Sequence, residues 1–96
     1  MACQVFLEAT IKDGCHDQLK AKFAELLPDT RDFDGCISIY ITIDQDNPSQ
    51  MVTIELWDSR AHYEKYLAWR VDSGVMDELA TMMENPSWRY LDNWGV

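Results

Sequence analysis

Isoleucine at every second position marks the middle of this chain as a strand. Between Cys36 and Asp44 the residues on one side are all isoleucine, and a period of two is typical of a strand with one buried face. Met51 to Trp57 alternates in the same way. The polar segment Asp44 to Ser49 between them has the composition of a turn, so the two strands are predicted to form a hairpin.

The two ends of the chain show the same alternation. Cys3 to Lys12 is a predicted strand that ends in the turn Lys12-Asp13-Gly14. Ser87 to Trp94 is the predicted last strand. The residues on one face of this last strand are Trp88, Tyr90, Asp92 and Trp94.

A period near 3.6 residues follows the first strand and predicts an amphipathic helix. This helix begins near Cys15. Its apolar stripe consists of Leu19, Phe23, Leu26 and Leu27. Pro28 is expected to end or kink the helix because proline lacks a backbone N–H, and Asp29 to Asp34 is expected to be a polar bridge.

A second helical region follows the hairpin. Ser59 is a suitable N-cap for a helix that runs to about Arg70. Asp72-Ser73-Gly74 interrupts the pattern, and a further helix is expected over about Val75 to Glu84. Asn85-Pro86 should then stop that helix.

The order strand, helix, strand, strand, helix, helix, strand predicts an α+β fold. It fits a ferredoxin-like four-stranded antiparallel sheet with helices on one face. Ninety-six residues without a linker or repeat predict one domain over residues 1–96.

The regular apolar faces of three strands are expected to pack against the helices. These faces are Val5, Leu7, Ala9 and Ile11; Ile37, Ile39, Ile41 and Ile43; and Val52, Ile54 and Leu56. The opposite face is expected to carry Phe6, Glu8, Tyr40, Thr53, Glu55 and Trp57, joined by Trp88, Tyr90 and Trp94 or their neighbours. Because that face is too aromatic to be left in water, we expect a second copy to cover it in a homodimer.

Charge and cysteine usage narrow the classes of partner. The net charge of −9, from 8 basic and 17 acidic residues, argues against nucleic acid. No apolar run reaches the roughly 20 residues that span a membrane, and the N-terminus lacks the pattern of a signal peptide. The odd number of cysteines, 3, without CxxC spacing favours free thiols in a cytoplasmic protein.

Three motifs in order resemble one known family. They are Gly14 after the first strand, Asp34-Gly35-Cys36 before the second, and Glu55 to Ser59 at the entry to a helix. Together they are similar to the antibiotic biosynthesis monooxygenase (ABM) family over nearly the whole chain. The resemblance implies a dimeric α/β barrel. Several members oxidise quinols or polycyclic phenols with molecular oxygen and no metal, flavin or haem, and a sister branch degrades haem.

The resemblance draws attention to the corner between strand and helix at Trp57. Many members carry a histidine nine residues after this tryptophan, and Tyr66 stands there in this chain. Leu7 and Met76 stand where the haem-degrading branch has an asparagine and a histidine, so haem is not an implied ligand. No cofactor is expected.

Cofactor-free oxygen chemistry needs apolar walls, a hydrogen-bond partner or base for a phenol, and a cation. The candidate catalytic residues are Tyr66, Arg70 and His62, with Arg70 as the cation and His62 as a base near neutral pH. The candidate substrate-binding residues are Tyr63, Trp69 and Trp57. Two histidines, 46 positions apart and without a cysteine cluster, predict no metal site.

Each candidate also has a structural interpretation. Trp57 is the size of a packing anchor, and Tyr63 and Tyr66 have the spacing of core residues on a helix. His62 lies off that stripe and fits a surface position, and Arg70 could pair with a nearby acid.

The sequence leaves three candidate functions. The first is a monooxygenase that acts on a quinol or polycyclic phenol with molecular oxygen and no cofactor. The alternative is a non-enzymatic dimeric module that binds a small aromatic or apolar ligand, and a third reading is a module that only dimerises.

Overall fold

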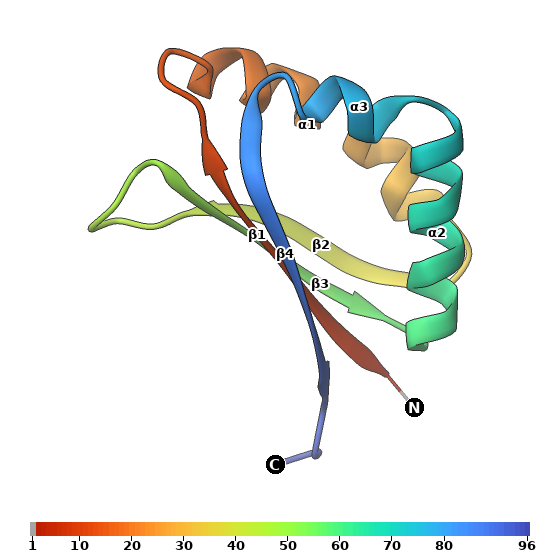
Figure 1. Cartoon of the computed structure of the whole chain (residues 1–96). Coiled ribbons are helices and arrows are strands. Elements are labelled where there is room, and N and C mark those ends of the chain that lie inside the picture. The colour runs from red at the N-terminus through yellow and green to blue at the C-terminus, as the bar shows by residue number, and fades with distance from the viewer. Residues whose placement is uncertain (1) are drawn as a thin grey trace.

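Four strands and three helices make up the chain in the computed structural model, which describes residues 2–96. In order they are β1 (Cys3–Ile11), α1 (His16–Asp32), β2 (Cys36–Ile43), β3 (Gln50–Trp57), α2 (Arg60–Asp72), α3 (Val75–Leu79) and β4 (Met83–Asp92). The strands form one antiparallel sheet in the order β2-β3-β1-β4, and all three helices cover one face of it (Figure 1). This confirms the predicted ferredoxin-like α+β fold. Within residues 2–96, no helix is long and apolar enough to cross a membrane.

The first helix does not end at Pro28, which corrects the sequence-based prediction. α1 continues through Pro28 to Asp32, so most of the expected polar bridge is helical. The last turn carries Thr30, which is fully buried and hydrogen-bonded to the side chains of α2. These tertiary bonds stabilise the turn after the proline and offset the lost backbone hydrogen bond.

The prediction was also wrong about the face of β3 that meets the helices. Met51, Thr53, Glu55 and Trp57 are buried beneath the helices, whereas Val52, Ile54 and Leu56 lie on the open face. The register explains this, because Val5 pairs with Glu55 and Leu7 with Thr53, and paired residues point to the same side. Both sides of β3 alternate regularly, so the pattern alone did not identify the buried one.

The isoleucine face of β2 is only partly buried. Ile39 is in the core, but Ile37 and Ile43 keep 53% and 43% of their surface exposed. β2 is an edge strand, and its register shifts between Cys36 and Ser38. An edge strand has a neighbour on one side only, and the irregularity leaves Ile37 unpaired and exposed while Cys36 still packs against the core.

The last strand begins four residues earlier than predicted and contains the expected helix stop. α3 is correspondingly shorter and ends at Leu79. Asn85 has φ +55°, and the register of β1 against β4 shifts there, so Asn85 and Pro86 form a bulge opposite Ala9. A bulge accepts both a left-handed residue and a proline within a strand. The pairing of Val5 with Tyr90 and of Leu7 with Trp88 turns both aromatic residues toward the helices, not toward the open face.

The glycine before β2 allows the closest approach between the sheet and α2. Gly35 has φ +92°, and a Cβ atom there would lie 2.5 Å from the His62 ring. The N-cap of α2 lies beside it, where Ser59 Oγ accepts the backbone N–H of His62, as the sequence predicted.

The replacement Gly35→Ala should therefore destabilise the protein by more than about 2 kcal/mol, since it adds a steric clash to the backbone strain of a positive φ. Gly14→Ala is the matched control, because Gly14 has φ +77° but open space around it. Its expected cost is about 1 kcal/mol. Urea unfolding of both variants provides the measurement. Equal losses for the two variants would show that the His62 contact does not constrain Gly35.

Candidate functional site

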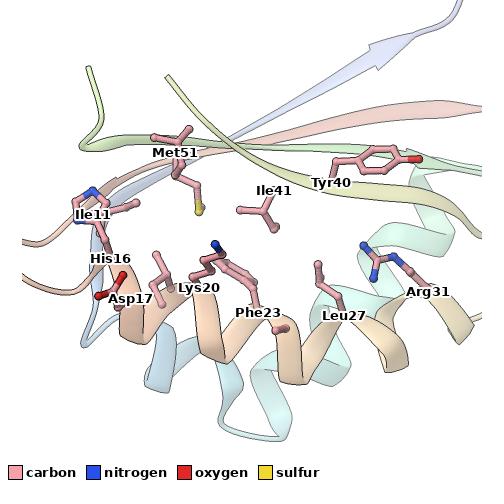
Figure 2. A pocket seen from close by; sticks show the side chains of 13 residues that line it. Ile11, His16, Asp17, Lys20, Phe23, Leu27, Arg31, Tyr40, Ile41 and Met51 are labelled. Carbon is pink, nitrogen blue, oxygen red and sulfur yellow. The ribbon is translucent and has the colours of Figure 1, made fainter. Parts of the chain in front are cut away.

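A groove of about 520 Å³ runs between α1 and the neighbouring strands (Figure 2). We call it the outer groove. Leu19, Phe23 and Leu27 of α1 form one wall, and Ile41 and Met51 lie opposite them. Its volume lies within the range of small-molecule sites, roughly 300–1,000 Å³. The groove is therefore large enough for an aromatic ligand and has apolar walls for it to pack against.

Basic side chains surround this apolar groove. Lys20 projects its amino group into the space, and Arg31 lies at the end near Tyr40 (Figure 2). The ion pairs among residues 2–96 involve other basic groups, so neither Lys20 nor Arg31 is neutralised by an acid. Asp17 is the only acid in the lining. The groove is thus a local positive region in a chain of net charge −9.

His16 and Arg31 are partly held by backbone carbonyls. His16 Nε2 lies 2.8 Å from the Pro48 carbonyl oxygen, and Arg31 Nη2 donates to the Ile39 carbonyl at 3.2 Å. No hydrogen bond fixes the Lys20 amino group among the described residues. Lys20 is therefore the cation most available to a ligand in the groove.

A second, much smaller space lies between the sheet, α1 and α2. This inner cavity measures about 40 Å³, and its walls include Thr53, Glu55, Tyr66 and Arg70. Phe23 and Leu27 line both this cavity and the outer groove. Two apolar side chains thus separate the open groove from a mostly apolar inner cavity that includes Glu55 and Arg70 in its walls.

Arg70 is buried, with 4% of its surface exposed, and it organises one wall of the inner cavity. Its Nη2 donates to the Leu26 carbonyl at 2.9 Å and to Thr30 Oγ1 at 3.1 Å, and its Nε donates to the Tyr66 hydroxyl at 3.0 Å. Thr30 and Tyr66 hydroxyls are also bonded to each other, at 2.8 Å. Two of the predicted catalytic residues, Tyr66 and Arg70, therefore form one network.

Glu55 lies on the sheet side of the same cavity and is 3% exposed. Its two oxygens accept hydrogen bonds from the Thr53 hydroxyl at 2.7 Å and from Trp57 Nε1 at 3.1 Å. Burial raises the pKa of Glu55 above its usual value, and these two donors oppose the shift. No salt bridge joins Glu55 to Arg70 within the described chain.

Two of the predicted substrate-binding residues lie in the core. Trp57 is fully buried and its ring centroid is 5.5 Å from that of Tyr63. The Tyr63 hydroxyl accepts a hydrogen bond from Trp88 Nε1 at 2.8 Å. Burial raises the pKa of the Tyr63 hydroxyl, so it stays protonated at neutral pH.

The remaining two candidates lie outside both spaces. Trp69 is 39% exposed and stacks on Phe33, with 5.4 Å between the ring centroids. His62 Nδ1 lies 2.6 Å from Ser59 Oγ at the start of α2. Trp57, Trp69 and His62 line neither the outer groove nor the inner cavity.

Sequence reasoning missed the outer groove, although a signal for it was present. The groove residues of α1 recur at helical spacing: His16, Lys20, Phe23, Ala24, Leu27 and Arg31. Their mixture of basic and apolar types is the feature that could have marked this face. Residues 2–96 contain no group of three or more His, Cys, Asp or Glu side chains close enough to hold a metal ion.

The raised pKa of Glu55 predicts a specific pH dependence of stability. A carboxyl with a higher pKa in the folded state favours folding most when it is protonated, so this contribution is lost as pH rises above the unfolded value, about 4.5. Glu55→Gln should remove that loss, and its stability relative to the natural protein should increase between pH 4.5 and 7. Urea unfolding across this range measures the difference.

The exposed Glu84, at the start of β4, supplies the control. Glu84→Gln makes the same chemical change at a solvent-exposed position, so the gain expected for Glu55→Gln should be absent from it. A constant difference between Glu55→Gln and the natural protein would show that Glu55 does not titrate differently on folding.

Comparison with solved structures supports the fold. A conserved protein from Methanosarcina mazei Go1 has a TM-score of 0.87 at 14% identity and covers 97% of this chain and 93% of its own. A protein from Shewanella oneidensis has a TM-score of 0.75 at 23% identity, covering 94% of this chain and 88% of its own. These identities establish the shared fold alone.

A third similar structure is that of SnoaB, a cofactor-independent oxygenase from Streptomyces nogalater. It has a TM-score of 0.82 at 13% identity and covers 96% of this chain and 92% of its own. None of the curated proteins compared with this chain matches it in sequence. The family model described as antibiotic biosynthesis monooxygenase matches residues 4–70, which include β1, the hairpin and most of α2. The chain therefore belongs to the antibiotic biosynthesis monooxygenase (ABM) family.

Proposed function

We propose that this protein is a monooxygenase that oxidises a quinol or polycyclic phenol with molecular oxygen and no cofactor. Membership of the ABM family supports the reaction class. The observation that carries the proposal is the outer groove, about 520 Å³ in volume, with apolar walls and two basic residues without acidic partners. In this proposal the outer groove admits the substrate.

The positive charge of Lys20 and Arg31 would favour ionisation of a phenolic substrate. A phenol passes an electron to oxygen more readily as its anion, so a site gains by stabilising the phenolate. Lys20 and Arg31 are eleven residues apart on α1, about 16 Å at the rise of a helix. They therefore flank a length that accommodates several fused rings between Phe23 and Ile41.

The role of each predicted residue depends on whether its side chain lines the groove or the inner cavity. Tyr66 and Arg70 line the inner cavity behind Phe23 and Leu27, and they would receive the substrate oxygen when those two side chains move aside. Tyr63 and Trp57 would support the inner cavity from the core. The sequence predicted a catalytic role for His62 and a substrate-binding role for Trp69. Neither side chain lines the groove, so these roles require the substrate to reach the outer surface of α2.

A second candidate function is a non-enzymatic dimeric module that binds a small aromatic or apolar ligand. The observation in its favour is that Tyr66, Thr30 and Arg70 satisfy one another around a cavity of only about 40 Å³. In this reading the polar network stabilises the core, and the outer groove holds a ligand without turnover.

We also propose that the protein works as a homodimer in the cytoplasm. The open face of the sheet carries Phe6, Ile54 and Tyr40 in one row across three strands. Sheet-on-sheet packing with a second copy would remove these side chains from water. The three cysteines are free, which supports a reducing compartment.

Oxygen uptake distinguishes the two functions. Purified, metal-free protein should consume oxygen with hydroquinones or anthrones above the uncatalysed rate. Ala24→Trp should reduce the rate at least tenfold by filling the groove, while Ala21→Trp, a neighbouring α1 position that does not line the groove, should not. Tyr66→Phe and Arg70→Lys should also reduce it if these residues receive the substrate oxygen.

Ligand binding without oxygen uptake, detected as a thermal shift with the same compounds, would favour the binding module instead. Equal rates for Ala24→Trp and Ala21→Trp would contradict the placement of substrate in the outer groove.

The dimer has its own test in light scattering at micromolar concentration. Ile54→Lys should give a monomer, because a charge on the open face opposes its burial against a second copy. Val71→Lys, an exposed position on α2, should leave the dimer intact. A monomeric natural protein would contradict the proposal.

A further inference from the structure

Glu55 is the one fully buried acid among residues 2–96. Every other Asp or Glu in that range keeps at least partial contact with solvent. Burying a carboxylate without a cationic partner is unfavourable, and such groups cluster at functional sites. Neither of the two candidate functions gives Glu55 a part.

Its hydrogen bonds hold Glu55 as an acceptor. The Leu7 backbone N–H donates to Thr53 Oγ1 at 3.2 Å, which directs the Thr53 hydroxyl hydrogen to Glu55 Oε2. Trp57 Nε1 can only donate, and it donates to Oε1. Both oxygens therefore face donors, which is the arrangement of an anion ready to take a proton.

The cation of the same cavity is held separately. Arg70 bonds to Leu26, Thr30 and Tyr66 through Nε and Nη2, and Nη1 takes part in none of these bonds. A base and a cation that share a cavity without neutralising each other can act on the same ligand. The base takes a proton, and the cation stabilises the negative charge that remains.

We propose that Glu55 is the proton acceptor of this site and acts on the hydroxyl group of a phenol. The phenol would pass from the outer groove into the inner cavity by pushing the side chains of Phe23 and Leu27 aside. The inference rests on the proposed function. In this step the phenolic O–H bond breaks, the proton joins Glu55 Oε2, and the electron pair stays on the phenolate oxygen in the inner cavity, which Arg70 also lines. No oxidant takes part in the transfer.

Few other ionisable groups face Glu55. Arg70, Tyr63 and Tyr66 do so from α2, Cys36 from β2 and Tyr90 from β4. The side chains that α1 and α3 contribute to the inner cavity carry no charge. Burial raises the pKa of the Cys36 thiol to about 11, and that of Tyr63 also rises, so both stay protonated at neutral pH. This leaves Glu55 as the base of the interior.

2-Naphthol is a suitable probe, because it is neutral in water at pH 7 and its anion absorbs at longer wavelength. Bound to the natural protein at pH 7, it should show the naphtholate band. Glu55→Gln should still bind it but lose the band, and Glu55→Asp, which keeps a carboxylate on a shorter side chain, should restore part of it. Glu84→Gln should leave the band unchanged.

2-Methoxynaphthalene has the same rings without the proton and should bind the natural protein and Glu55→Gln equally. Binding of 2-naphthol in its neutral form, or a full naphtholate band in Glu55→Gln, would overturn the role of Glu55 and leave the groove as a binding site. Failure of the natural protein to bind either compound would overturn the placement of substrate in the groove together with the role of Glu55. Thermal unfolding of each variant verifies that it is folded.

Discussion

The buried guanidinium of Arg70 fixes the relative position of the two long helices. It donates to Leu26 and Thr30 on α1 and to Tyr66 on its own helix, while 4% of its surface remains exposed. Leaving a buried hydrogen-bonding group unpaired costs about 1–3 kcal/mol, and more for a charged group, so sliding of one helix past the other is unfavourable. This constraint holds the last turn of α1 in place after Pro28. It also positions Phe23 and Leu27, the wall between the outer groove and the inner cavity.

The positions of the positive charges contrast with the negative net charge of the chain. The surface is strongly acidic, yet the outer groove contains Lys20 and Arg31 without acidic partners, and the interior contains an arginine. Only Arg70 is in a low-dielectric space, where a positive charge acts more strongly on an anionic ligand than the exposed charges of Lys20 and Arg31 do. Family membership gives the reaction class, and this charge distribution gives the reason that a phenolate would be stabilised here.

Both sides of the sheet carry apolar residues, but they differ in how their polar groups are satisfied. The face toward the helices includes Glu55 and Thr53, which are satisfied by hydrogen bonds to one another and to Trp57. The open face carries Val52, Ile54 and Leu56, which need no such partners. Polar residues such as Glu8 and Thr42 share this face, and its apolar row of Phe6, Ile54 and Tyr40 is the part suited to packing against a second sheet.

The sequence by itself determined the elements, the N-cap at Ser59, the fold class and the family resemblance. These depend on local periodicity, capping and motif order, which a chain carries independently of its contacts. Only the tertiary structure decided that α1 passes Pro28, that Asn85 and Pro86 form a bulge, and that Glu55 is buried. A distant residue supplies what local preference lacks in the first two cases: Arg70 and Tyr66 for the turn after Pro28, and β1 for the bulge. Glu55 is buried because side chains of α1 and α2 close over it, while its neighbours Thr53 and Trp57 satisfy its oxygens. The outer groove likewise exists only where α1 faces β2 across the folded chain.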